Sequence, residues 1–432
     1  MKRYEDYKES GVGWIGEIPA AWDIVKVKNA FSIQKRIVGF DGPDVLSITQ
    51  KGIVKKDITS GEGQLAESYK NYQWLYPGEF AMNHMDLLTG WVDCSTYEGV
   101  TSPDYRVFAP TISLDRRFYT YLFQHCYSAK VFYGFGQGVS NFGRWRLPAD
   151  EFNNFLIPLP PIETQKAIST YLDIKTAEID SLIEETEKSI ELLEEYRKSV
   201  ISEAVTKGLN SDAPMKDSGI EWIGEIPNHW EIDSLSRSMS MITNGYVGPT
   251  RDLFHESGIR YIQSLHVVNG SLDFEKHPYY VSEEWSKKHS RSVLKSGDVL
   301  VVQTGAIGNV AYVDTEFDGC NCHALIILRA SSKVLGKYLF YCLHSARGKD
   351  AMLMTKTGAT HPHLNSTKIC HVTIPLPPIK EQEEIVEELD KTEAFIAPVI
   401  ECKKETIEAL KELRKSLISE AVTGKFKVPG VI

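Results

Sequence analysis

The chain has 432 residues, of which 58 are Asp or Glu and 48 are Lys or Arg, giving a formal net charge of −10 at pH 7. A chain of this length exceeds what one hydrophobic core fills, so two or more domains are expected. No apolar run approaches the ~18 residues that a membrane span needs, and no apolar segment follows the basic start, so we expect a cytoplasmic protein without a membrane partner.

One block opens the chain and returns near its middle. It reads SGVGWIGEIPAAWDI at residues 10–24 and SGIEWIGEIPNHWEI at residues 218–232. Both copies keep two tryptophans in matched positions, Trp14 with Trp22 and Trp222 with Trp230. Recurrence in a matched frame favours a structural role for these rings, at the joint between a helix and the neighbouring domain, over a ligand site.

Each copy of this block is followed by different text. Residues 25–156 and 233–373, which we call the variable segments, share almost no alignable sequence. Both are typical of mixed strand and loop regions with Gly turns. In the second variable segment, GDVLVVQTGAIGNVAYV at residues 297–313 predicts two strands around a Gly-rich turn.

A second duplicated block predicts two long helices. IPLPPIETQKAISTYLD from Ile157 matches IPLPPIKEQEEIVEELD from Ile374, and the offset of 217 residues persists through LEEYRKSVISEAVT and LKELRKSLISEAVT. Apolar residues of the first copy recur every three, four or seven positions, on one helix face, and the offset leads to an apolar residue each time. These positions are Ile168, Leu172, Ile179, Ile183, Ile190, Leu193, Val200 and Ala204, with Ile385, Leu389, Ile396, Ile400, Ile407, Leu410, Leu417 and Ala421 in the second copy.

Such a helix would be roughly 65 Å long at about 1.5 Å per residue, so it needs a partner along its length. The other copy is the obvious partner, and the two stripes predict an antiparallel coiled coil. Pro398, which stands where the first copy has Ser181, predicts a kink or break in the second helix only.

The negative charge is concentrated in these predicted helices. Residues 161–210 hold 11 acidic and 6 basic side chains, and residues 374–425 hold 12 and 8. By contrast, residues 25–157 hold 14 basic and 13 acidic side chains, and residues 233–373 hold 15 and 12. The variable segments are therefore free to face an anion such as DNA.

Together these patterns predict an α+β fold, a tandem pseudo-twofold repeat of two mixed α/β domains joined by two long antiparallel coiled-coil helices. A repeated frame with unlike inserts suits a reader of two different DNA half-sites, because a stiff spacer fixes their helical phase. The expected boundaries are a first domain at 1–160, a spacer helix at 161–208, a second domain at 209–377, a second spacer helix at 378–425 and a tail at 426–432.

The repeated motifs resemble the specificity subunit of type I restriction-modification systems over nearly the whole chain. They are WIGEIPAAW with WIGEIPNHW, IPLPPIETQKAI with IPLPPIKEQEEI, and RKSVISEAVTKG with RKSLISEAVTGK. The resemblance implies two target-recognition domains that read a bipartite double-stranded DNA sequence with an unspecified spacer, and no catalysis in this chain. It also implies two modification subunits that methylate adenine with S-adenosylmethionine, and restriction subunits that cut DNA with ATP and Mg. The outer helix faces near Arg197, Lys198, Arg414 and Lys415 would then dock the modification subunits.

The motifs of the other enzyme classes are missing from the sequence. It has no Asn-Pro-Pro-Tyr or Asn-Pro-Pro-Phe for adenine methylation and no G-x-x-x-x-G-K-[ST] loop for ATP, and GFGQG at 134–138 lacks the dinucleotide-binding spacing. The clusters CNCH at 320–323 and HPH at 361–363 do not match metal-ligand spacings. We therefore expect no catalytic residue, cofactor, metal or small-molecule substrate in this chain.

Candidate DNA-contacting residues are polar or cationic side chains in Gly-flanked loops, because such groups read base edges or hold phosphates. In the first variable segment they are Gln34, Lys35, Arg36, Asn83, Ser140, Asn141, Arg144 and Arg146. In the second they are Thr243, Asn244, Tyr246, Arg251, Gln303, Thr304, Asn309, Thr360, His361, His363 and Asn365. A structural role stays open for each, since Asn-Gly pairs also form turns and surface Arg or Lys is usually only solvated.

Two other classes of protein were weighed against this interpretation. The recognition part of a self-contained methyltransferase or nuclease would need the methylation motif that the repeat lacks. An acidic coiled-coil scaffold or DNA-mimicking inhibitor would carry its acidity on the variable segments, which are instead slightly basic.

Overall fold

The computed structural model describes residues 2–59, 66–138, 145–250, 252–358 and 362–431. It divides into two compact units, one formed by Met1–Thr186 with Glu405–Ile432 and the other by Glu187–Lys404. We call these unit 1 and unit 2. Each contains one variable segment and a piece of both long helices, because α4 (Ile162–Lys207) and α10 (Ile379–Val422) each pass through both ranges.

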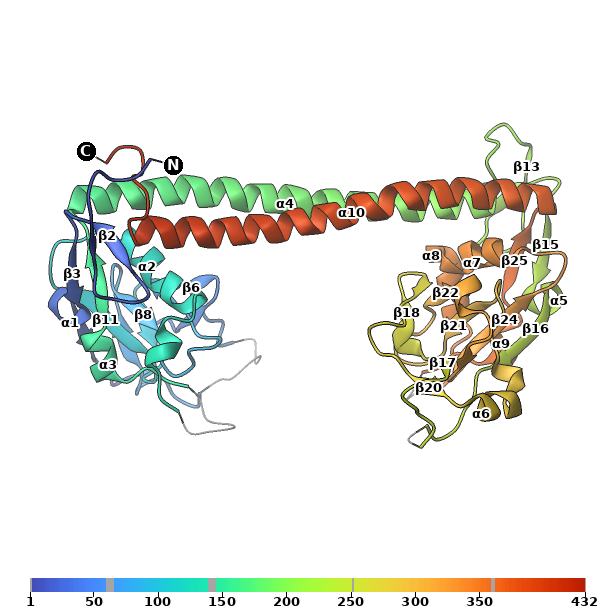
Figure 1. The fold of residues 1–432 in the computed structure, drawn as a ribbon, viewed down its shortest axis with the longest axis horizontal. Helices are drawn as coiled ribbons and strands as arrows, with labels where there is room; N and C mark the ends of the chain where they lie inside the picture. Colours follow the sequence, from blue (N-terminus) through green and yellow to red (C-terminus); the bar gives the residue numbers. More distant parts are fainter. Residues whose placement is uncertain (1, 60–65, 139–144, 251, 359–361, 432) are drawn as a thin grey trace. The chain divides into compact units, whose positions relative to one another are not determined.

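Unit 1 is built on a four-stranded antiparallel sheet of order β4-β11-β8-β9. Figure 1 labels its two central strands, β11 and β8. The aromatic core of unit 1, which includes Phe80, Phe108 and Phe123, joins the sheet to α2. The elements are β1 (Tyr7–Glu9), β2 (Glu17–Pro19), β3 (Asp23–Lys26), α1 (Val27–Ala30), β4 (Phe31–Gln34), β5 (Leu46–Thr49), β6 (Gly52–Lys55), β7 (Gln73–Leu75), β8 (Phe80–Met82), β9 (Val92–Cys94), β10 (Gly99–Thr101), β11 (Arg106–Pro110), α2 (Arg116–Ser128), α3 (Ala149–Asn154) and β12 (Leu156–Leu159).

Unit 2 is built on a four-stranded antiparallel sheet of order β16-β24-β21-β22. The elements before the sheet and on it are β13 (Met215–Asp217), β14 (Glu225–Pro227), β15 (Glu231–Ser234), α5 (Leu235–Ser238), β16 (Met239–Asn244), β17 (Ile259–Ile262), β18 (Val267–Val268), β19 (Ser271–Leu272), β20 (Tyr280–Val281), α6 (Glu283–Lys288), β21 (Val299–Val302), β22 (Val310–Tyr312), β23 (Asn321–Cys322) and β24 (Leu325–Ala330). They are followed by α7 (Gly336–His344), α8 (Ala346–Leu353), α9 (Ser366–Ile369) and β25 (Thr373–Leu376). The predicted strand pair in residues 297–313 is confirmed as β21 and β22.

The two units share one topology although their variable segments do not align in sequence. The order β4-β11-β8-β9 corresponds strand for strand to β16-β24-β21-β22. In each unit a short strand before the sheet pairs with the strand that precedes a long helix, β3 with β12 and β15 with β25. A helix follows the last sheet strand in both, α2 in unit 1 and α7 in unit 2. The predicted tandem repeat of two mixed α/β domains is thus confirmed.

The apolar stripes of the long helices are buried or half-buried at every predicted position. In unit 1, Ile168 and Leu172 near the start of α4 share a core with Leu417 and Ala421 near the end of α10. In unit 2, the end of α4 shares a core with the start of α10, through Ile201, Ala204, Ile385 and Leu389. Start therefore meets end in both units, which confirms the predicted antiparallel helix pairing.

Of the kink or break expected at Pro398, the break is wrong, because α10 continues through this residue as one helix, and the kink stays a prediction. Pro398 is exposed, so its ring is not forced into the core. Ile396 and Ile400 on either side of it are 2% and 6% exposed. Their burial holds the helix together against the loss of one backbone hydrogen bond at the proline.

The repeated block at residues 10–24 and 218–232, which we call the tryptophan block, packs against the end of a long helix in both units. Trp22 and Trp230 are fully buried, which confirms their structural role. A Cβ built on Gly424, just after α10, would lie 3.0 Å from Cη2 of Trp22, and one built on Gly208, just after α4, would lie 3.1 Å from Cζ2 of Trp230. Both glycines have a φ above +70°, as expected where a left-handed residue ends a helix.

Candidate nucleic-acid interface

In unit 2, three separate segments bring polar candidate residues together at one edge of the sheet. Nε2 of Gln303, just after β21, donates a 3.1 Å hydrogen bond to Oδ1 of Asn244, the last residue of β16. The backbone oxygen of Gln303 accepts from N–H of Leu364 at 3.1 Å. His363 forms a backbone bridge with Thr357, with N–O distances of 3.0 and 2.9 Å. Asn244, Gln303 and His363 therefore meet, with the exposed Thr304 next to them.

Unit 1 repeats this arrangement with different side chains. Strand β4 ends at Gln34. Strand β8, which β11 separates from β4 in the sheet, ends just before Asn83. The backbone oxygen of His84 accepts from N–H of Leu147 at 2.9 Å, as that of Gln303 does from Leu364. Arg146, which is exposed, forms a backbone bridge with Gln137 at 2.8 and 3.0 Å, in the place of the bridge between Thr357 and His363. We call these two edges the reading edges.

The side chains of several candidate residues already contact other residues of their own unit. Arg36 forms an ion pair with Glu79 and lies over the ring of Tyr76, 4.8 Å from its centroid. Asn365 accepts the N–H of Thr367 at 2.9 Å and so caps α9, while Nζ of Lys349 donates a 2.8 Å hydrogen bond to Oδ1 of Asn309. Side-chain contacts also occupy Asn83, whose Oδ1 accepts from N–H of Met85, and Tyr246, which packs edge-on against Trp285 and His289.

The remaining candidates fall into two groups. Thr243 is buried within β16, while Lys35 is exposed and Gln34 is half-buried, with its amide donating to Oγ of Ser32 at 2.7 Å. The rest of the predicted contact residues lie outside the described part of the chain: Ser140, Asn141, Arg144, Arg251, Thr360 and His361.

The structure adds Arg106, which the sequence analysis missed. The residue is 6% exposed, and its guanidinium donates a 2.9 Å hydrogen bond to the backbone oxygen of Leu147 and lies over the ring of Phe152. Burial lowers the pKa of Arg106 to about 10. Burial, Arg106 and Arg146 together lower the pKa of His84 to about 4. A charged residue in the otherwise apolar strand RVFAP is the signal that could have identified it.

The reading edge of unit 1 therefore lies over a buried cation. No carboxylate within ion-pairing distance of Arg106 is found among the residues that the structure describes. A buried charge is costly unless it is neutralised, so this positive potential favours an anion at the surface above it.

The described ranges hold neither a metal site nor a membrane-spanning helix. They contain no group of three or more His, Cys, Asp or Glu side chains that could hold a metal ion. None of their helices is both long and apolar enough to cross a membrane. Cys320 and Cys322 are buried with free thiols, and burial raises their pKa values, that of Cys320 to about 11.

Two of the helix residues expected to dock partner subunits, Arg197 and Arg414, form ion pairs inside their own units. In unit 1, Nε of Arg414 pairs with Oδ1 of Asp180 at 2.9 Å, and in unit 2, Nε of Arg197 pairs with Oε1 of Glu393 at 2.6 Å. Both pairs join α4 to α10 and fix the register of the helices inside a unit.

Comparisons with known proteins identify the family. The sequence model described as "Type I restriction modification DNA specificity domain" matches residues 43–192 and 249–412. The MjaVIII specificity subunit of Methanocaldococcus jannaschii is 29% identical over 284 residues, covering 64% of this chain and 63% of that relative. The putative MjaX specificity subunit of the same organism is 24% identical over 432 residues, covering 96% of both chains.

Solved structures agree on the fold. A chain from a study of complex assembly and conformational transition of the type I R-M system superposes with a TM-score of 0.72 at 16% identity, covering 94% of this chain and 98% of that one. The HsdS subunit of Thermoanaerobacter tengcongensis gives a TM-score of 0.53 at 16% identity, with the same coverage. The scaffold or DNA-mimic alternative finds no support among these relatives, of which the two from Methanocaldococcus jannaschii are named specificity subunits. The family model spans most of the sequence in two separate matches, and the chain therefore belongs to the type I restriction-modification DNA specificity family.

Proposed function

We propose that the chain reads a bipartite target in double-stranded DNA, one half-site with each unit, across a spacer whose sequence is not read. The observation that carries this proposal is the pair of reading edges. They occupy equivalent places on one shared topology, yet they present different side chains: Gln34, Asn83 and Arg146 in unit 1, and Asn244, Gln303 and His363 in unit 2. Equivalent placement with unlike chemistry is what two different half-sites require.

The proposed contacts to bases come from side chains at or next to these edges. In unit 2, Gln303 and Asn244 form a linked amide pair, and Gln or Asn amides pair bidentately with adenine. Arg146 of unit 1 is exposed and suits guanine or phosphate. The candidates outside the described residues stay part of the proposal on sequence grounds. Ser140, Asn141, Arg144, Thr360 and His361 fall in sequence between the residues of the two backbone bridges, and Arg251 ends the stretch ITNGYVGPTR. We propose the domain boundaries stated from the sequence, with residues 1–160 and 209–377 as the two target-recognition domains.

The chemistry belongs to partner subunits in this proposal. Two modification subunits would bind S-adenosylmethionine and methylate adenine, and restriction subunits would use ATP and Mg. Tyr196 and Leu413, which are 217 residues apart and hence equivalent in the repeat, are 59% and 51% exposed on α4 and α10. Two matched apolar side chains on equivalent helix positions would offer the same docking point to two copies of one subunit.

The test is to express the chain with its modification subunit and to sequence the host DNA for N6-methyladenine. We expect a split motif with two defined halves and a fixed gap. Replacing residues 25–156 by the variable segment of another family member should change one half only, while the other half and the gap persist. A stable complex that methylates no defined motif would contradict the proposal.

A single substitution distinguishes a residue that contacts bases from one that only supports the fold. Gln303→Ala should relax specificity in the half-site of unit 2, since a bidentate contact contributes about 1–3 kcal/mol of discrimination. The matched control is Ser332→Ala, an exposed residue of unit 2 that follows β24 at the end of that strand away from Gln303. Equal motifs from both variants would remove Gln303 from the reading set.

A further inference from the structure

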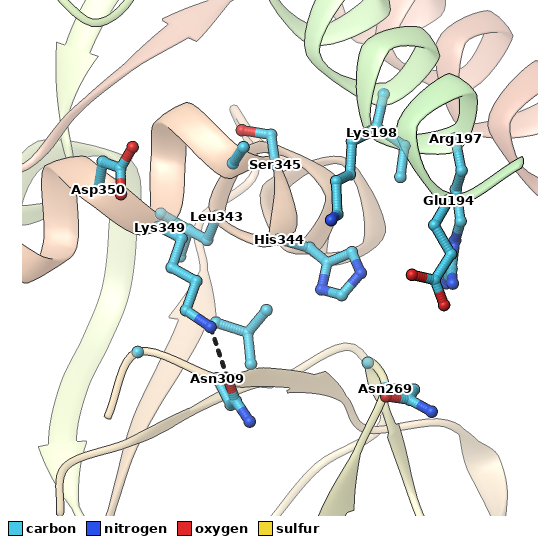
Figure 2. A pocket seen from close by; sticks show the side chains of 15 residues that line it. Glu194, Arg197, Lys198, Asn269, Asn309, Leu343, His344, Ser345, Lys349 and Asp350 are labelled. Atoms are coloured by element: carbon cyan, nitrogen blue, oxygen red, sulfur yellow. Dashed lines mark hydrogen bonds between the residues drawn. The ribbon is translucent and has the colours of Figure 1, made fainter. Parts of the chain in front are cut away.

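A groove in unit 2 lies between the end of α4 and the domain built on the second variable segment. Its volume is about 480 Å³, and three segments line it: the β18–β19 turn at Asn269, the β21–β22 turn at Asn309, and the junction of α7 and α8 around His344. Figure 2 shows the side chains of Lys198 and Lys349 directed into this groove from α4 and α8, with His344 between α4 and the turns.

A groove in unit 1 is built from the corresponding elements. Its volume is about 630 Å³, and it lies between α10 and the domain built on the first variable segment. The β5–β6 turn at Lys51 takes the place of the β18–β19 turn, the β8–β9 loop at Trp91 that of the β21–β22 turn, and the end of α2 at Lys130 that of the α7–α8 junction. Arg414 of α10 lines it as Arg197 of α4 lines the groove of unit 2, at the same position of the repeat.

In a chain of net charge −10, each groove is lined by more cations than carboxylates, although two of these cations, Arg197 and Arg414, are already held in ion pairs with Glu393 and Asp180. Three cations line each of them: Arg197, Lys198 and Lys349 in unit 2, and Lys51, Lys130 and Arg414 in unit 1. The acidic side chains are fewer, Glu194 and Asp350 in unit 2 and Asp93 in unit 1. Such a balance attracts an anion, and the ammonium groups reach it as point charges without directional demands.

Each groove is continuous with the reading edge of its own unit through a single loop. In unit 2 the loop of residues 303–309 begins at Gln303, on the reading edge, and ends at Asn309, in the groove. In unit 1 the loop of residues 83–91 begins at Asn83 and ends at Trp91, in the groove. An anion that extends from the reading edge along this loop reaches the groove, and a DNA backbone is such an anion.

We propose that these two grooves hold phosphates of the DNA backbone next to each half-site, through Lys198 and Lys349 in unit 2 and Lys51 and Lys130 in unit 1. The proposal rests on the proposed DNA-reading function and adds the sequence-independent contacts to it. The long helix contributes the same residue of the repeated RKS motif to both grooves, Arg197 in unit 2 and Arg414 in unit 1. An identical cation is suited to the part of DNA that is identical everywhere, its phosphates.

The position of Lys198 differs from the one expected for a residue that docks a modification subunit on the outer helix face. This side chain lines the groove rather than the outer helix face. An acidic segment of a modification subunit is the competing occupant, and the shared loop with the reading edge favours DNA over it. The experiment below separates the two.

The test measures the binding of the methyltransferase complex, this chain with its modification subunits, to a duplex that carries the methylated motif and to a scrambled duplex of equal length. The variants are Lys198→Gln with Lys349→Gln, and Lys51→Gln with Lys130→Gln. We expect each double variant to reduce the slope of log K against log salt by about 2, and to weaken binding of both duplexes equally, by roughly 10- to 60-fold at 0.1 M salt. The preference for the motif should stay unchanged.

Lys188→Gln is the matched control, since Lys188 is an exposed lysine of α4 that does not line the groove, and its slope should equal that of the unmodified complex. An unchanged slope in the double variants would overturn the proposal, and so would a complex that no longer assembles, which would assign the grooves to the partner subunit. Failure of the proposed function has a different signature, because the unmodified complex would then bind both duplexes equally.

Discussion

The hydroxyl of Tyr341 on α7 donates a 2.6 Å hydrogen bond to Oδ1 of Asp390 on α10. In the other unit, the hydroxyl of Tyr121 on α2 donates a 2.7 Å hydrogen bond to Oδ1 of Asp173 on α4. The two aspartates are 217 residues apart, at the same position of the repeat. A cation follows the same pattern, since Lys337 pairs with Asp390 and Arg117 with Asp173. Each domain helix is thus anchored to a spacer helix by one repeated carboxylate.

The first prediction concerns this anchor. Tyr341→Phe removes a hydrogen bond to a charged group and should lower the free energy of unfolding by about 1–3 kcal/mol. Tyr121→Phe should have a similar effect in unit 1. Chemical denaturation of the purified chain measures both. Tyr196→Phe, at an exposed position on α4, is the control and should change little. A loss in Tyr341→Phe no larger than in this control would show that the anchor adds nothing to stability.

The second prediction concerns the contact between Gly424 and the tryptophan block. Gly424→Ala faces two costs, a left-handed backbone with φ of +72° and a Cβ that would lie 2.5 Å from Cδ of Pro19. Gly11→Ala has φ of +70° and nothing within 4 Å of its Cβ, so it faces the backbone cost alone. We expect about 1–2 kcal/mol of destabilisation for Gly11→Ala and about 1–3 kcal/mol more for Gly424→Ala. Equal melting temperatures of the two variants would contradict the close packing at Gly424.

The third prediction concerns the proline inside α10. Pro398→Ala restores a backbone donor at an exposed helix position and should raise the free energy of unfolding by up to about 3 kcal/mol. The matched change is Ser181→Pro at the equivalent, exposed position of α4, which should lower it by a similar amount. Denaturation midpoints of the two variants on either side of the parent chain are the expected result. A destabilised Pro398→Ala would show that the proline is adapted to its helix.

The fourth prediction concerns pH. Burial, Arg197 and Lys349 lower the pKa of His344 from its usual 6.5 to about 4 in the folded chain. Between pH 6.5 and pH 4, the unfolded chain binds a proton at this histidine and the folded chain does not. The contribution of the neutral His344 to the free energy of unfolding is therefore complete above pH 6.5 and is lost as the pH falls towards 4. His344→Gln should therefore flatten the fall of unfolding free energy over this range, by up to about 1.4 kcal/mol per pH unit. Denaturation series at several pH values measure the slope, and at pH 8 the same variant reports any packing change at Phe340, on which the ring stacks. Parallel slopes for variant and parent would contradict the assignment.

The sequence by itself determined the repeated frame. The two spacer helices, their equivalent starting points and their apolar faces follow from patterns that repeat every three, four or seven residues, and these patterns need no knowledge of distant contacts. The buried Trp22 and Trp230 were predicted for the same reason, because duplication marks them directly. Of the kink or break expected at Pro398, the break does not occur, since the local effect of the proline is outweighed by the burial of Ile396 and Ile400 on either side.

Only the tertiary structure decided how the variable segments fold and which of their polar residues meet. Their strands are short and pair over long distances along the chain, as Phe31 does with Pro110, so nothing local in two unlike sequences reveals the shared strand order. The contacts of the candidate site residues were likewise decided by the tertiary structure. Asn365 caps a helix and Arg36 forms an ion pair with Glu79, while Gln303 forms a hydrogen bond with Asn244 at the sheet edge. A side chain's type states what it can bind, but the contacts that are already made around it decide what it is free to bind.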